Sequence, residues 1–93
     1  MPRPLVRPER INSPQTQELG RRLRVFREAK GVSQEQLAFE TGVNRTYIGN
    51  LERGRINPTL YNIMRVAEAV GVDPGELVKG LPPLRPSPPD KGA

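Results

Sequence analysis

One short segment of the chain, RTYIGNLER, places hydrogen-bonding side chains at helical spacing. At about 100° per residue, Ile48 and Leu51 share one face of the predicted helix. The opposite face carries Arg45, Thr46, Gly49, Asn50 and Arg53. The Arg45 guanidinium can bond both O6 and N7 of guanine, the Asn50 amide suits adenine, and Thr46 suits a thymine methyl group or a phosphate. A solvated face would usually carry Glu and Lys instead, so the pattern predicts a helix that packs on one side and reads DNA bases on the other.

Two short helices joined by a tight turn position this face. Ser33 is a typical cap for the first helix, with Gln36 three residues on as its capping-box partner. Asn44 caps the second helix in the same way, so only Gly42 and its neighbour remain to form the turn. Helices joined this closely must cross rather than lie antiparallel. The pattern predicts a helix-turn-helix whose second helix, about residues 45–53, lies in the DNA major groove.

Two small residues in this segment indicate close approaches. Ala38 is small, as a position where one helix crosses over another requires. Gly49 lies inside a helix, where glycine costs about 0.5 to 1 kcal/mol relative to alanine. Its presence indicates a backbone that comes close to another group, and DNA and a neighbouring helix both remain open as that group.

Glycines divide the chain into helices. Five of them follow helical patterns and predict helix ends, namely Gly31, Gly42, Gly54, Gly71 and Gly80. Because no stretch alternates as a strand would, we expect an all-α fold of five helices. The first helix runs from about Pro14, with Ser13 as its cap, to Lys30. Its spacing predicts four buried residues, Leu19, Leu23, Phe26 and Ala29.

The last two helices follow from the same signals. The fourth opens near Thr59, and its apolar spacing predicts an inward face of Leu60, Ile63, Met64, Ala67 and Val70. A short fifth helix is expected to begin at an Asp73-Pro74 cap and to end near Lys79.

Composition limits the possible functions. The chain has 93 residues, a net charge of +5, a pI near 10.4 and a mean hydropathy of -0.61. These values fit one small domain with a polyanionic partner and no membrane segment. Because Cys and His are both absent, disulfides, thiolate or imidazole metal sites and His-based catalysis are excluded.

Enzymatic function finds no support in the motifs. The chain has neither G-x-x-x-x-G-K-[ST] nor G-x-G-x-x-G, and its closest carboxylates are explained by helix N-termini and solvated faces. We expect a protein that is not an enzyme and needs no cofactor and no metal. The opening MPRPLVRPER lacks the apolar stretch of a signal peptide, so a cytoplasmic location is expected.

The helix-turn-helix segment resembles a known family. With its continuation LERGRINPTLYNIMRVAEAVGV, it is similar to the Cro and repressor type of domain, which is lambda repressor-like. The resemblance covers about residues 15–80 and rests on G-V-S-Q before the first helix of the motif, the Gly42 turn, L-E-R-G after the second, and N-P-T-L before the next. RTYIGNLERG in particular resembles restriction-modification controller proteins.

The resemblance implies roles for individual residues. Asn50 matches a position that often reads bases, beside Arg45 and Thr46. The implied phosphate-contacting positions are Gln34, Asn44, Tyr47, Arg53, Arg55 and Asn57. For Tyr47, core packing and a phosphate hydrogen bond are equally open. Arg27 and Glu52 match positions that often form a structural ion pair between the first helix and the reader helix.

The ends of the chain differ in composition from the domain at residues 13–80. Residues 1–12 form an expected flexible arm rich in Pro and Arg, which either tracks DNA or is passive. Residues 81–93 form a Pro-rich tail.

The expected partners are double-stranded DNA and a second copy of the chain. Because one reader helix cannot select a site in a genome, we expect a homodimer on a palindromic operator. The dimer interface is either the C-terminal part or the exposed edge of the fourth helix. Two alternative functions stay open: an antitoxin-like protein that holds a partner protein and autoregulates its operon, and a bridging coactivator without sequence preference.

Overall fold

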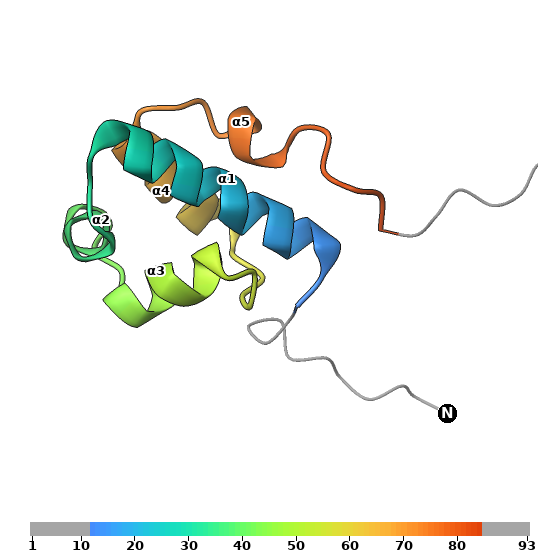
Figure 1. The fold of residues 1–93 in the computed structure, drawn as a ribbon, viewed down its shortest axis with the longest axis horizontal. Coiled ribbons are helices and arrows are strands. Elements are labelled where there is room, and N and C mark those ends of the chain that lie inside the picture. The colour runs from blue at the N-terminus through green and yellow to red at the C-terminus, as the bar shows by residue number, and fades with distance from the viewer. Residues whose placement is uncertain (1–11, 85–93) are drawn as a thin grey trace, which may run out of the picture.

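A computed structural model describes residues 12–84, which form five α-helices around one core (Figure 1). The helices are α1 (Pro14–Lys30), α2 (Gln34–Thr41), α3 (Arg45–Glu52), α4 (Leu60–Val70) and α5 (Gly75–Val78). The described residues contain no strand, and the predicted all-α fold of five helices is confirmed. The predicted N-terminal arm and Pro-rich tail lie outside the described residues, except for Asn12 and residues 81–84.

Side-chain caps begin four of the helices. Ser13, Ser33, Asn44 and Thr59 each accept a hydrogen bond from a backbone N–H of the first helical turn. The capping box predicted at Ser33 does not form. Gln36 lies along the helix, where its Nε2 donates to Glu40 (3.4 Å), and its oxygen does not accept from the Ser33 N–H. The box forms at α1, where Thr16 takes the third position.

The glycines end helices as predicted. Gly31, Gly42 and Gly71 are left-handed C-caps with φ between 75° and 81°, a region that favours glycine. The start of α5 differs from the prediction. Asp73 accepts a bond from the Gly75 N–H (2.6 Å) as an Asx turn does, and α5 begins only at Gly75, without a side-chain cap.

The core lies where α1, α2, α3 and α4 meet, and α5 adds Leu77 to it. Its largest wholly buried side chains are Leu23, Leu37, Ile48, Leu51, Val66 and Leu77. Three predictions of burial are wrong: Ala29, Leu60 and Met64 are exposed. The apolar residues of α4 cover more of the helix circumference than its neighbours can bury. Val66, Ala67 and Val70 face the core, so Leu60, Tyr61 and Met64 form an exposed apolar face on α4.

Helix α1 is the central element, with α3 and α5 on opposite sides of it in Figure 1. Gly20 permits the close crossing with α3, because a Cβ there would lie 2.7 Å from the carbonyl carbon of Glu52. The sequence pattern did not indicate this crossing; it assigned the small crossing residue to Ala38, which is buried in α2. None of the helices in residues 12–84 combines the length and apolar character needed to span a bilayer.

Candidate nucleic-acid interface

The two helices of the motif cross. Figure 1 shows α2 almost end-on and α3 lying across the view, joined by a short turn. Ile48 and Leu51 anchor α3 and are wholly buried, whereas Arg45, Thr46 and Arg53 are exposed. The polar face of α3 therefore lies outward on a fixed helix, as DNA reading in the major groove requires.

The first turn of α3 presents two free side chains. Arg45 and Thr46 are exposed, and within residues 12–84 no hydrogen bond or ion pair joins either side chain to another group. Asn44 precedes them as the N-cap, and its Oδ1 accepts bonds from the backbone N–H groups of Thr46 (2.6 Å) and Tyr47 (3.3 Å). The Asn44 oxygen is thus committed to the helix, and its NH₂ group remains free to donate.

The second turn of α3 brings Asn50 and Arg53 together. Arg53 Nη2 donates to Asn50 Oδ1 (3.0 Å), and its guanidinium lies close to Gly49. A Cβ on Gly49 would be 3.5 Å from Arg53 Nη1, which is an ordinary van der Waals distance. Gly49 is buried in α3, and the atoms nearest to it belong to the side chains of Arg53 and of Gln34 in α2.

A buried ion pair joins α1 to the end of α3. Arg27 Nε lies 2.5 Å and Nη2 3.1 Å from the two carboxylate oxygens of Glu52, and these side chains are only 10% and 3% exposed. Arg27 Nη1 also donates to the carbonyl oxygen of Val32 (2.7 Å). The Glu52 carboxylate raises the pKa of Arg27 by its hydrogen bond, so Arg27 stays charged at neutral pH.

Gln34 belongs to the same network. Its Nε2 donates to Glu52 Oε1 (2.9 Å), which ties the first residue of α2 to the last residue of α3. The sequence placed Gln34 only at the phosphate backbone, and no local signal links residues 34 and 52. With Nε2 bonded to Glu52, the amide has one further N–H and its oxygen available for other partners.

The remaining predicted residues are Tyr47, in the first turn of α3, and two residues of the connection that follows the helix. Tyr47 is half-buried against the core, and its hydroxyl oxygen accepts a bond from Asn62 Nδ2 (3.1 Å). The Tyr47 O–H is left to donate outward, so both interpretations of this residue are compatible with its position. Arg55 and Asn57 are exposed in the connection to α4. Asn62 was not anticipated, because only the fold places it beside Tyr47.

The other arginines of α1 are engaged with carboxylates. Arg21 and Arg22 both pair with Glu18 (2.9 Å each), and their hydrogen bonds lower the pKa of Glu18 to about 2. Arg22 also donates to the carbonyl oxygen of Lys79 (2.6 Å), toward α5. Arg24 pairs with Glu28 (3.1 Å).

Comparison with known proteins identifies the class to which this arrangement belongs. The helix-turn-helix family matches residues 23–77, and the chain belongs to that family of DNA-binding transcriptional regulators. The predicted resemblance to Cro and repressor domains is therefore confirmed.

Restriction-modification controller proteins are among its relatives. The control protein C.BamHI of Bacillus amyloliquefaciens is 45% identical over 60 residues, which are 63% of this chain and 74% of the relative. The crystal structure of C.AhdI from Aeromonas hydrophila has a TM-score of 0.65 and 48% identity over 67% of this chain and 94% of that one. The controller C.Esp1396I, solved as a tetramer with its natural 35 base-pair operator, has a TM-score of 0.63 and 27% identity over 67% and 82%.

Proposed function

We propose that the protein is a sequence-specific transcription regulator that inserts α3 into the major groove of its operator. The observation that carries this proposal is the contrast along α3. Glu52 is locked to α1 and α2, while Arg45 and Thr46 have no protein partner within residues 12–84. In this proposal Arg45, Thr46 and Asn50 contact base edges, and the Arg45 fork pairs with guanine.

Donors around α3 are proposed to hold the DNA backbone. Gln34, Asn44, Tyr47, Arg53, Arg55 and Asn57 each keep at least one N–H or O–H group that can meet a phosphate oxygen. These contacts position the protein without reading sequence directly. A net charge of +5 supports the same assignment.

The protein is proposed to act as a homodimer on a palindromic operator. One reader helix discriminates by about 1 to 3 kcal/mol per good contact, which is too little to select a genomic site alone. The exposed apolar face on α4 supports this arrangement, since Leu60, Tyr61 and Met64 are 72%, 65% and 49% exposed. Large exposed apolar faces mark interaction sites.

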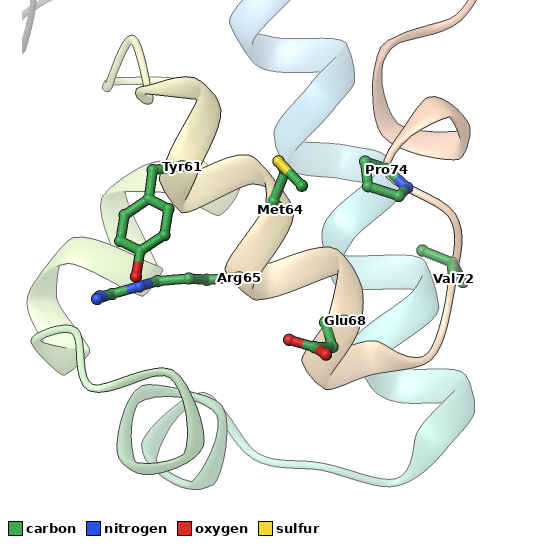
Figure 2. A pocket seen from close by; sticks show the side chains of 6 residues that line it. All are labelled: Tyr61, Met64, Arg65, Glu68, Val72 and Pro74. Carbon is green, nitrogen blue, oxygen red and sulfur yellow. The ribbon is translucent and has the colours of Figure 1, made fainter.

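A groove continues this apolar face toward α5. The groove has a volume of about 450 Å³. It is lined by Tyr61, Met64, Arg65 and Glu68 of α4 and by Val72 and Pro74 of the next connection, which Figure 2 labels. The Arg65 guanidinium lies over the Tyr61 ring, 4.4 Å from its centroid. An apolar side chain of a second copy would fit this groove.

Selection of bound sequences from random duplex DNA tests the proposed function. Purified full-length protein should enrich a palindrome whose half-sites lie about one helical turn apart. Enrichment of no sequence, or of a single asymmetric site, would contradict it.

The interface is tested separately by sedimentation. Leu60→Ser with Met64→Ser should shift the protein from dimer to monomer. Val78→Ser with Leu84→Ser is the matched control, because these residues are exposed (40% and 92%) but lie outside the α4 face. Loss of the dimer only in the control would place the interface in the C-terminal part.

A further inference from the structure

Asn50 has a fixed orientation in the structure. Its Oδ1 accepts a hydrogen bond from Arg53 Nη2 at 3.0 Å. A guanidinium donates only, so the amide must present its oxygen to Arg53 and its NH₂ group away from it. Asn50 is half-buried, which further limits its rotation. The Nδ2 donor and the second lone pair of Oδ1 are left to meet DNA.

The Arg53 guanidinium lies beside Gly49. A Cβ at position 49 would lie 3.5 and 3.6 Å from Arg53 Nη1 and Nη2 and 3.7 Å from Gln34 Oε1. The Gln34 amide is bonded to Glu52, whose side chain is 3% exposed. Arg53 and Gln34 thus both lie beside Gly49, and Arg53 is bonded to Asn50.

We propose that Arg53 is a positioning residue that sets the base preference of Asn50, an inference that rests on the proposed function. Bidentate pairing with adenine uses the amide oxygen as an acceptor and the NH₂ group as a donor, so the orientation of the amide decides which base edge it fits. Arg53 sets that orientation through Oδ1. The base preference at the Asn50 position therefore depends on Arg53.

Two Arg53 variants separate the effect of positioning the Asn50 amide from the effect of the positive charge on Arg53. Lysine keeps the positive charge for a phosphate but lacks the planar fork, whereas alanine removes both. The matched control is Arg55→Ala, which removes an exposed cation of the next connection and leaves Arg53 in place. Asn50→Ala locates the operator position that Asn50 reads.

The experiment is selection from random duplex DNA by the full chain and each variant, with affinities measured on the parent operator and on unrelated DNA. The parent should prefer one base at the Asn50 position by about fivefold or more, the lower range for one good contact. Arg53→Lys should lose most of this preference, and its binding to unrelated DNA should weaken less than that of Arg53→Ala. Arg55→Ala should weaken binding to both DNAs and keep every base preference.

Several outcomes would overturn the proposal. An unchanged preference in both Arg53 variants would show that Arg53 does not orient the amide. So would an Asn50→Ala protein with the parent's preferences. Thermal unfolding of each variant should match the parent, because Arg53 is exposed. A parent that enriches no sequence would instead contradict the proposed function itself, and this proposal with it.

Discussion

The two ends of α3 place charged residues in opposite environments. At its C-terminal end, Glu52 is buried and bonded to Arg27 and Gln34. At its N-terminal end, Arg45 is exposed and has no protein partner within residues 12–84. Burial without a partner would be prohibitive for either charge. The difference shows that one short helix is fixed at one end so that the other end can present side chains to a ligand.

The first test removes one partner of the buried ion pair at the C-terminal end of α3. Arg27→Ala should lower the free energy of unfolding by about 3 to 5 kcal/mol, because it leaves the Glu52 carboxylate buried without its cation. Replacement of both residues together, by Met and Leu, should cost less than either single change. Denaturant unfolding of the three variants measures these differences.

The exposed pair Arg24 and Glu28 is the control for that test. Its side chains are 64% and 56% exposed, so loss of either should change stability by no more than about 0.5 kcal/mol. Equal, small effects at both pairs would show that the Arg27–Glu52 pair does not behave as a buried one.

The second test uses ionic strength to distinguish the buried ion pair from the exposed cations that are proposed to contact DNA. Arg53 and Arg55 give four proposed phosphate-binding cations in a dimer, and each contributes about 0.9 to the slope of log affinity against log salt. DNA affinity should fall roughly 100-fold between about 50 and 200 mM salt. The free energy of unfolding should change little, since buried pairs are screened weakly. A flat binding curve would contradict the phosphate assignments.

The third test compares two glycines inside helices. Gly20→Ala should destabilise the protein by about 1 to 3 kcal/mol, because its Cβ would meet the α3 backbone. Gly49→Ala should stabilise it by about 0.5 to 1 kcal/mol, because the nearest atoms are side-chain ends at van der Waals distance. Thermal and denaturant unfolding distinguish them. If Gly49→Ala also weakens DNA binding, the added Cβ acts by displacing the Arg53 guanidinium beside it.

The last test concerns only the exposed N-terminal end of α3. Arg45→Ala should weaken binding to the preferred operator by about 1 to 3 kcal/mol and relax one base position in each half-site. Its unfolding should match the parent, because the side chain contacts solvent. Arg55→Ala, the control, should weaken specific and nonspecific binding alike. Unchanged base preferences in the Arg45 variant would move the reading to Thr46, Asn50 or DNA shape.

Much of the fold was predictable because its signals are local. Ser13, Ser33, Asn44 and Thr59 begin helices in the structure as their residue types indicate. A cap depends only on a side chain and backbone N–H groups two or three residues away. The polar face of α3 follows from spacing within a single helix, and the chain therefore revealed its motif without any knowledge of packing.

Contacts between distant segments were decided by the tertiary structure. Gly20 meets residue 52, Gln34 bonds Glu52, and Leu60 is left outside the core. Each outcome depends on which helix faces lie against each other, and helical spacing alone does not fix that. An apolar stripe states that a face can be buried, but the neighbouring helices determine how much of it is covered.

The sequence by itself thus determined the five helices, the side-chain caps of the first four, and the helix-turn-helix with its outward polar side chains. Only the tertiary structure decided which of those polar side chains are held and which are free. A hydrogen-bond partner removes a group from the set that can contact DNA, and such partners come from other turns and other helices. Arg53 and Asn50 are adjacent on one face in the sequence pattern, yet only their folded geometry shows one holding the oxygen of the other.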